Sequence, residues 1–209
     1  TRTNIFIDDL RRYKQFKKNF VNKDFLDFGC GWGGFLSTVK NTKFLNGVEL
    51  RKECTDYIAK NHKKFNVKND INLFNKKFDI ITAFHVLEHI PFQVKTLKKL
   101  GSKLKKNGKI IIEVPHAEDF LILQKELQEF KHFTFWSEHL ILHTEKSLRT
   151  TLRKAGFKNI KIDFFQRFNL NNHLGWFLKK KPGGHEFFSE IASSELNQEY
   201  CKNLIRLKK

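Results

Sequence analysis

Two short runs of residues could bind a ligand through main chain and a carboxylate. The first reads D-F-G-C-G-W-G-G at 27–34, and the second reads G-V-E-L at 47–50. Glycine has no Cβ atom, so a ligand can approach the backbone of the first run closely. A helix that follows would add unpaired N–H groups and a positive dipole end. Glu49 would lie where the two hydroxyls of a bound ribose need an acceptor, so the two runs predict a nucleotide-bearing cofactor.

Two classes of cofactor fit that spacing. Gly29, Gly31 and Gly34 also satisfy G-x-G-x-x-G, the fingerprint of the dinucleotide-binding dehydrogenases. Asp27, however, stands two residues before the first glycine, where a dinucleotide-binding strand is usually apolar. This residue and the run F-D-I-I-T-A-F-H-V-L-E-H at 78–89 favour a different class of cofactor.

Five motifs in this order resemble a known family of enzymes. They are D-x-G-x-G-x-G, G-V-E-L, N-D-I at 69–71, F-D-I-I-T-A-F-H-V-L-E-H-I and L-K-K-N-G-K-I-I-I-E-V-P. Together they resemble the class I S-adenosylmethionine-dependent methyltransferases, over residues 20–165. Within that superfamily the chain is most similar to the branch that contains the ubiquinone-biosynthesis O-methyltransferases and many small-molecule and sugar methyltransferases.

The resemblance implies a fold, a cofactor and a set of contacts. The fold would be α/β, with a doubly wound, mostly parallel Rossmann-like sheet and helices on both faces. The cofactor would be S-adenosylmethionine. The implied contacts are Asp27, Gly29, Gly31 and Gly33 for the methionine part, Glu49 for the ribose, Asp70 with Ile71 for the adenine edge, and Phe84 with His85 for the rim beneath the adenine; Leu50 is a further candidate contact.

Histidines are the candidates for a catalytic base. In a methyl transfer the cofactor carries the reactivity and the protein mainly aligns the acceptor, so a base contributes only when a hydroxyl or amine must lose its proton. Histidine titrates near neutral pH, which makes His89, His116, His132 and His139 the candidates. Each also has a structural alternative: His89, for example, could form a hydrogen bond at the start of a helix.

A metal site is not assigned. The ubiquinone-type methyltransferases and some RNA 2′-O-methyltransferases carry E-x-x-E-H, which binds a divalent metal, at the position where this chain has His85-Val86-Leu87-Glu88-His89. The first carboxylate is therefore replaced by histidine. His85, Glu88 and His89 could still share one helical face toward a metal, but H-V-L-E-H also resembles the metal-independent relatives.

The length and composition fit one folded domain. The chain has 209 residues, of which 40% are hydrophobic and 23 are Phe, enough for a single core. The cysteines, Cys30, Cys54 and Cys201, are far apart and match no disulfide or zinc pattern. No run approaches the roughly 18 apolar residues of a membrane span, and the start resembles no signal peptide. We therefore expect a cytoplasmic protein with reduced thiols.

The net charge of +18 raises the possibility of a nucleic-acid partner. The basic residues are scattered rather than striped, and F-H-V-L at 84–87 differs from the N/D-P-P-Y/F pattern of enzymes that methylate base amino groups. We expect a small-molecule acceptor instead, such as a hydroxyl of a phosphorylated or nucleotide-linked sugar or of a quinone precursor. RNA 2′-O-methylation and a noncatalytic cofactor-binding or partner-binding module are the alternatives.

Residues 1–209 are expected to form a single methyltransferase domain. In order, we expect an N-terminal cap helix at 1–20, a cofactor-binding half at 21–115, an insertion at 116–143 that forms a substrate wall, a helix and the sixth strand at 144–168, and a C-terminal loop and helix at 169–209. Within the cofactor-binding half, Lys106-Asn107-Gly108 would end the helix that precedes a strand at 110–114. The resemblance implies a seventh strand, antiparallel between the fifth and sixth, and we expect it to be missing because no apolar run typical of a strand follows residue 168.

Two segments outside the regular alternation are candidates for choosing the substrate. The insertion is rich in aromatic residues and histidine, which could line a substrate wall or pack a covering helix: His116, Phe120, Phe130, His132, Phe133, Phe135, Trp136, His139 and His143. The basic turn at 179–185 could hold a phosphate or form an ordinary solvated lysine run.

Overall fold

The chain forms two compact units in the computed structural model, which describes residues 2–135 and 138–209. The first unit contains Thr1–Val114 and Lys154–Phe157, and the second contains Pro115–Arg153 and Lys158–Lys209. Two compact units can belong to one folding domain, so the single methyltransferase domain stays a prediction. Each unit is described by itself below.

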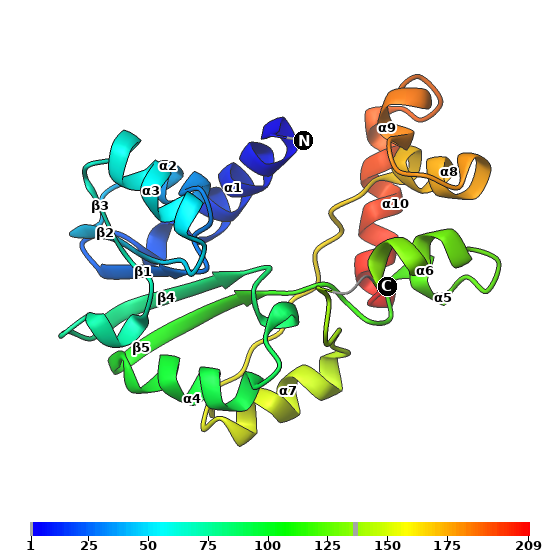
Figure 1. Ribbon diagram of the computed structural model, residues 1–209. Helices are drawn as coiled ribbons and strands as arrows, with labels where there is room; N and C mark the ends of the chain where they lie inside the picture. Colours follow the sequence, from blue (N-terminus) through cyan, green and yellow to red (C-terminus); the bar gives the residue numbers. More distant parts are fainter. Residues whose placement is uncertain (1, 136–137) are drawn as a thin grey trace. The chain divides into compact units, whose positions relative to one another are not determined.

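A five-stranded parallel sheet is the centre of the first unit (Figure 1). Its strands are β1 (Asp24–Phe28), β2 (Phe44–Val48), β3 (Phe65–Lys68), β4 (Phe78–Phe84) and β5 (Leu104–Glu113). They lie in the order β3-β2-β1-β4-β5, and each neighbouring pair is parallel. The chain thus changes direction across the sheet between β1 and β4, and ligands of doubly wound folds bind at such a switch point.

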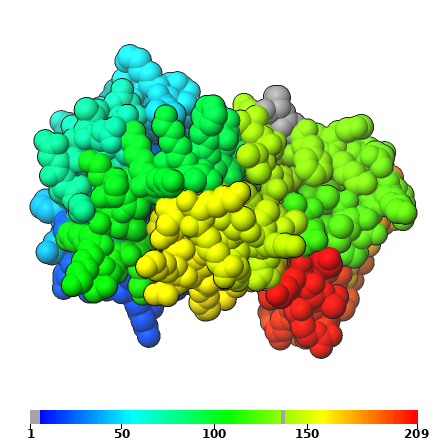
Figure 2. Space-filling view, turned by 90° about the horizontal axis from the view of Figure 1, so that it is seen from below, coloured from blue at the N-terminus to red at the C-terminus, as the bar shows by residue number. Residues whose placement is uncertain are grey.

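Helices cover both faces of this sheet, as the α/β prediction requires. The helical elements are α1 (Arg2–Phe16), η1 (Lys17–Asn19), α2 (Gly34–Thr38), α3 (Lys52–Asn61), η2 (Ile71–Leu73), η3 (Leu87–His89) and α4 (Gln93–Ser102). The first three α-helices lie on one face and α4 lies on the other, where it is seen in green from below (Figures 1 and 2). The doubly wound Rossmann-like fold is confirmed.

Successive apolar residues of β1 and β4 point to opposite faces of the sheet, so that a hydrophobic core forms on each face. Phe25 and Ile80 pack in a cluster with Phe20 and Leu36, on the side of α1 and α2. The next residue in each strand, Leu26 or Ile81, packs in the opposite cluster, which contains Leu100 of α4. Because side chains of a strand point alternately to its two faces, a strand buried on both faces reads as a continuous apolar run.

The helix before β5 ends earlier than predicted. We expected Lys106-Asn107-Gly108 to end it, but α4 ends at Ser102 and these residues belong to β5. Asn107 has a φ of 66°, and the β4–β5 register is irregular between Phe78 and Ile80. The turn-like residues therefore form an irregularity inside the strand, where Asn and Gly tolerate the left-handed backbone.

The second unit is helical. Its elements are α5 (Phe120–Leu123), α6 (Gln128–Thr134), α7 (Glu145–Lys154), α8 (Leu170–Lys179), α9 (Gly184–Phe187) and α10 (Ser194–Leu207), with Lys154 of α7 counted in the first unit. Leu121, Leu127, Phe130 and Trp176 form its buried cluster. The aromatic residues of 116–143 are thus partly core, as the alternative to a substrate wall supposed, and Trp136 lies outside the described residues.

Two predictions for the C-terminal third are wrong. Residues 160–168 form no strand, although Ile160, Ile162 and Phe164 alternate. Strand propensity is realised only against a neighbouring strand, and in the described part of the chain no strand follows β5. The expected loop after 168 is also helical, because Asn169 caps α8 by accepting a hydrogen bond from the N–H of Asn172 at 3.1 Å.

None of the helices within residues 2–135 and 138–209 is both long and apolar enough to span a bilayer.

Candidate cofactor site

The turn after β1, residues 29–34, is held in a conformation that glycine alone adopts easily. Gly29, Gly31 and Gly33 have φ angles of 77°, 52° and 80°, in the left-handed region that other residues avoid. The N–H of Gly29 donates to the carbonyl of Val48 at 2.8 Å. A Cβ atom on Gly29 would overlap Cγ2 of Val86. This segment, the glycine turn, is therefore fixed between β2 and the chain that follows β4.

One position of the glycine turn is open to a ligand. A Cβ atom on Gly31 would meet a single neighbour within 4 Å, Nη2 of Arg51 at 3.4 Å. Arg51 is a flexible, half-exposed side chain that can move away from the turn. Bare main chain at Gly31 is what close approach of a nucleoside-bearing ligand needs, so the glycine turn fits the cofactor that the sequence implies.

Glu49 follows β2 and faces the glycine turn. Its Oε2 accepts from the N–H of Gly31 at 2.8 Å, and its Oε1 accepts from the N–H and Nε of Arg51 at 3.0 and 3.1 Å. Burial by itself raises the pKa of Glu49, but the hydrogen bonds from Arg51 and Gly31 outweigh it and lower that pKa. The carboxylate is ionised at neutral pH, and its two oxygens can accept about four hydrogen bonds, so capacity for a hydroxyl remains.

Asp27 forms a hydrogen bond with a side chain of the neighbouring strand. Its Oδ1 accepts from the hydroxyl of Thr82 on β4 at 2.6 Å, and the side chain is buried. Burial raises the pKa of Asp27 to about 7, against the opposing hydrogen bond from Thr82. Its contact with the methionine part of a cofactor stays a prediction.

Three more residues expected to contact the cofactor lie at η2 and just after β2. Asp70 caps η2 through the N–H of Asn72 and accepts from Nζ of Lys99 at 2.8 Å, and its carboxylate is half exposed. Ile71 is buried in the core, whereas Leu50 is 81% exposed beside Glu49. Their contacts with the cofactor stay predictions.

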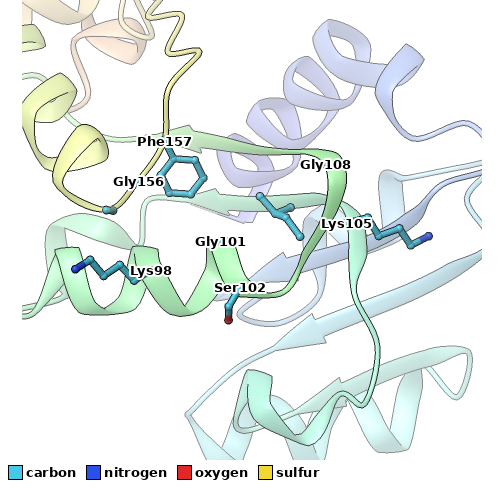
Figure 3. Close-up of a pocket in the computed structure, with 9 residues that line it drawn as sticks. Lys98, Gly101, Ser102, Lys105, Gly108, Gly156 and Phe157 are labelled. Carbon is cyan, nitrogen blue, oxygen red and sulfur yellow. The ribbon is translucent and has the colours of Figure 1, made fainter.

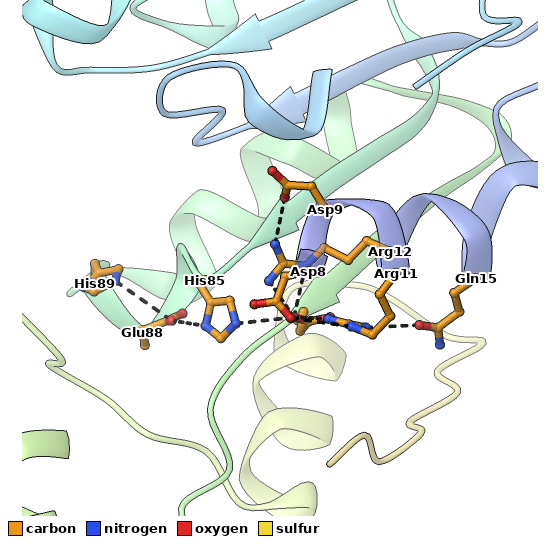
Figure 4. A network of polar contacts seen from close by, with 9 residues as sticks. Asp8, Asp9, Arg11, Arg12, Gln15, His85, Glu88 and His89 are labelled. Carbon is orange, nitrogen blue, oxygen red and sulfur yellow. Dashed lines mark hydrogen bonds and ion pairs between the residues drawn. The ribbon is translucent and has the colours of Figure 1, made fainter. Parts of the chain in front are cut away.

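His85 is fixed between two carboxylates at the end of β4 (Figure 4). Its Nδ1 lies 3.2 Å from Oε1 of Glu88, and its Nε2 lies 3.3 Å from Oε1 of Glu113. Burial by itself lowers the pKa of His85. The hydrogen bonds and charges of Glu113 and Glu88 outweigh burial, so that the pKa of His85 is raised above its ordinary value. Its backbone is left-handed, with φ 52°, and such strain in a non-glycine residue is common at functional sites. Phe84 next to it contacts Phe35 edge to face.

Two arginines of α1, which sequence reasoning did not select, bind Glu113. Arg11 Nη2 donates to both carboxylate oxygens at 2.8 and 2.7 Å, and Arg12 donates to Oε1 through Nε and Nη2 at 3.1 and 2.7 Å. The pair Arg11-Arg12 in an amphipathic helix and a carboxylate directly after the apolar run 110–112 are the sequence signals that could have indicated this contact. The contact of the two arginines with Glu113 holds α1 at the carboxyl end of β5.

The candidate bases come from different elements of the chain. His89 ends η3 in the first unit, with its Nε2 3.9 Å from Oε1 of Glu88. In the second unit, the backbone of His116 forms an isolated β-bridge with that of His143. Burial lowers the pKa of His116. His132 is exposed on α6, and Nδ1 of His139 bonds the carbonyl of Thr134 at 2.7 Å. The choice of base stays a prediction.

A cavity of about 380 Å³ lies elsewhere in the first unit, between α4, β5 and residues 155–157 (Figure 3). Lys98, Ser102 and Phe157 are among its lining residues. Lys105 also lines it, but its ammonium pairs with Asp24 and Asp79. The cavity has no glycine turn and no free carboxylate, so it lacks the groups that the cofactor needs.

Comparison with known families shows to which family the chain belongs. A family model described as a methyltransferase domain matches residues 4–162. The chain belongs to the class I S-adenosylmethionine-dependent methyltransferases. S-adenosylmethionine is the cofactor of this family, and the methyltransferase resemblance read from the five motifs is confirmed.

Curated relatives of this methyltransferase differ in their printed activities. A tRNA U34 carboxymethyltransferase of Nautilia profundicola is 27% identical over 80% of this chain and 63% of its own length. A ubiquinone biosynthesis O-methyltransferase of Coxiella burnetii is 33% identical over 47% of this chain and 46% of its own length. The methyltransferase thus spans less than two thirds of either relative.

Solved structures share the fold of the methyltransferase. A S-adenosylmethionine-dependent methyltransferase of Archaeoglobus fulgidus has a TM-score of 0.62 at 22% identity and covers 96% of this chain and 86% of its own. The magnesium protoporphyrin IX methyltransferase of Synechocystis PCC 6803, solved with S-adenosylhomocysteine, has a TM-score of 0.60 at 15% identity, with 80% of each chain covered.

Replacing Glu49 by alanine is expected to weaken S-adenosylmethionine binding at least tenfold. Hydrogen bonds to an ionised acceptor contribute roughly 1.5 to 3 kcal/mol each, and a tenfold change corresponds to about 1.4 kcal/mol. Titration calorimetry measures the dissociation constant. Glu53→Ala, an exposed carboxylate in the first turn of α3, is the matched control and should bind normally. An unchanged constant for Glu49→Ala would remove Glu49 from the site.

Proposed function

We propose that the protein transfers a methyl group from S-adenosylmethionine to a hydroxyl of a small molecule, such as a sugar, a nucleotide-linked sugar or a quinone precursor. The observation that carries the proposal is the open main chain at Gly31 beside the ionised Glu49. The ubiquinone biosynthesis O-methyltransferase among the relatives supports a hydroxyl acceptor. A cytoplasmic location is part of the proposal, and the three free cysteines agree with it.

The residues of the chain have limited chemistry to perform. When bound, S-adenosylmethionine supplies an electrophilic methyl group, so the protein must hold the donor, align the acceptor and exclude water. The glycine turn and Glu49 would hold the donor. His89 is our choice among the candidate bases, because it lies in the same unit as the glycine turn and follows β4.

Methylation of RNA at a 2′-hydroxyl is the second candidate. The net charge of +18 and the tRNA carboxymethyltransferase among the relatives favour it. A basic protein that contacts several phosphates binds more weakly as salt increases. Tight RNA binding that falls steeply between low and physiological salt would therefore support this candidate over the small-molecule one.

The deciding experiment supplies isotopically labelled methyl donor together with a cell extract divided into a small-molecule fraction and an RNA fraction. We expect mass spectrometry to find a labelled product in the small-molecule fraction, heavier than its precursor by one methylene unit plus the mass of the isotopic label. Glu49→Ala is the control for enzyme-dependent labelling. Label only in RNA would support the second candidate. Donor binding without product in either fraction would instead indicate a noncatalytic module.

A further inference from the structure

Helix α1 places a buried carboxylate directly on the glycine turn. A Cβ atom on Gly34 would lie 2.5 Å from Oδ2 of Asp9, and Asp9 is the sole neighbour that it would meet within 4 Å. Asp9 is 4% exposed. Gly34 begins α2, so the absence of its side chain is what lets this carboxylate reach the turn. Glycine at position 34 therefore allows α1 to pack against the turn.

The two oxygens of Asp9 have different surroundings. Oδ1 accepts from Nη1 of Arg12 at 3.1 Å (Figure 4). Oδ2, the atom against Gly34, accepts no hydrogen bond from any residue in the described ranges. This oxygen can therefore accept a hydrogen bond from a ligand that brings a donor to the glycine turn.

Arg12, which pairs with Asp9, has N–H donors to spare. Its guanidinium has five N–H donors; two bind Glu113 and one binds Asp9, which leaves two. The centre of the Phe84 ring lies 5.0 Å from the guanidinium carbon. The two hydrogen bonds to Glu113 fix the orientation of the guanidinium. Arg12 can therefore donate to a third carboxylate without losing its two present partners, Glu113 and Asp9.

This arrangement matches the chemistry of one part of the cofactor. The methionine end of S-adenosylmethionine carries an ammonium and a carboxylate on the same carbon. We propose that Asp9 binds the ammonium and Arg12 binds the carboxylate, so that α1 completes the cofactor site at the glycine turn.

The test compares ligands that have or lack the amino-acid end. S-adenosylhomocysteine carries it, and 5′-methylthioadenosine lacks it, while both keep the adenosine that Glu49 would bind. We expect titration calorimetry on the full chain to give tighter binding of S-adenosylhomocysteine to the wild type. Asp9→Asn should weaken S-adenosylhomocysteine at least tenfold and leave 5′-methylthioadenosine unchanged. Asp8→Asn, the adjacent carboxylate on α1, which pairs with Arg11 at 3.8 Å, is the matched control.

A second variant separates the two charges. Decarboxylated S-adenosylmethionine keeps the ammonium and the sulfonium but lacks the carboxylate. Arg12→Lys should weaken S-adenosylmethionine more than this analogue, because lysine cannot reproduce the forked contact, whereas Asp9→Asn should weaken both. Unchanged binding of 5′-methylthioadenosine shows that each variant keeps a folded adenosine site.

Several results would overturn the assignment. Equal affinity of the wild type for S-adenosylhomocysteine and 5′-methylthioadenosine would mean that α1 does not bind the amino-acid end. Binding of neither ligand would contradict the cofactor site as a whole, and this assignment with it. Equal weakening of both ligands by Asp9→Asn would mean that Asp9 acts through the fold. Tighter binding of S-adenosylhomocysteine by Asp9→Asn would mean that Asp9 repels the cofactor carboxylate.

Discussion

Gly29→Ala is expected to destabilise the protein by about 2 to 5 kcal/mol and to abolish cofactor binding. Two costs add at this position. A left-handed backbone costs a residue with a Cβ atom about 1 to 2 kcal/mol, and Gly29 has a φ of 77°. The new methyl group would also overlap Cγ2 of Val86, and overpacking of this kind typically costs about 1 to 3 kcal/mol. Urea unfolding and calorimetry with S-adenosylhomocysteine measure the two effects.

Gly156→Ala provides the control for backbone strain alone. Gly156 has a φ of 98°, yet a Cβ atom there would meet nothing within 4 Å. Its destabilisation should therefore be smaller than that of Gly29→Ala, and cofactor binding should persist. If the two variants lose equal stability, the contact with Val86 contributes nothing.

A double variant isolates the overlap. Val86→Ala removes the methyl group that the new Cβ would strike, so Gly29→Ala should cost less in that background. The coupling energy of such a cycle for residues in contact is typically about 0.5 to 3 kcal/mol. If the stability losses of Gly29→Ala and Val86→Ala simply add in the double variant, the glycine turn moves away from Val86 and is not held against it.

Features that depend on a few consecutive residues could be predicted from the sequence. The glycine turn follows from glycines at 29, 31 and 33, each of which has a positive φ, and Glu49 follows from its place directly after an apolar strand. Each of these is a local property, because backbone freedom and strand period are set within about ten residues. The family and cofactor could be recognised for the same reason.

Features that depend on packing between distant segments could not be predicted. Arg12 and Glu113 are separated by 101 residues, and no local pattern specifies which carboxylate an amphipathic helix will meet. The strand expected at 160–168 failed for a related reason, since its alternation says nothing about whether a neighbouring strand exists. The predicted end of the helix at 106–108 was wrong because Asn and Gly are common both at a helix end and at an irregularity in a strand.

Glu113→Gln is the other substitution with a large expected effect, about 2 to 4 kcal/mol of lost stability. Glu113 accepts from Arg11 and Arg12 and pairs with His85, and its side chain is 21% exposed. Removing one partner of a largely buried ion pair leaves the opposite charges uncompensated. Urea unfolding near pH 6 measures the loss. Glu145→Gln also breaks two ion pairs, with Arg149 and Lys208, but at the surface, where screening should leave a much smaller effect.

The pH dependence of that loss tests its electrostatic origin. Burial raises the pKa of Glu113, but His85, Arg12 and Arg11 outweigh burial and hold that pKa far below its ordinary value. Its stabilisation is therefore complete above the unfolded pKa of about 4.3 and is lost as the pH falls through the folded value. The pKa of His85 is raised, so its stabilisation is complete below about 6.5 and is lost as the pH rises through the folded value.

The difference between the unfolding free energies of wild type and Glu113→Gln should consequently be largest between about pH 4.5 and 6.5. It should shrink at lower pH, where the wild-type carboxylate gains a proton, and decline at higher pH, where His85 loses its own. Taking the difference removes most of the contribution of Asp27, whose pKa burial raises to about 7, because both proteins retain that residue. A difference that stays constant from pH 3 to 9 would mean that Glu113 stabilises α1 by packing and not by charge.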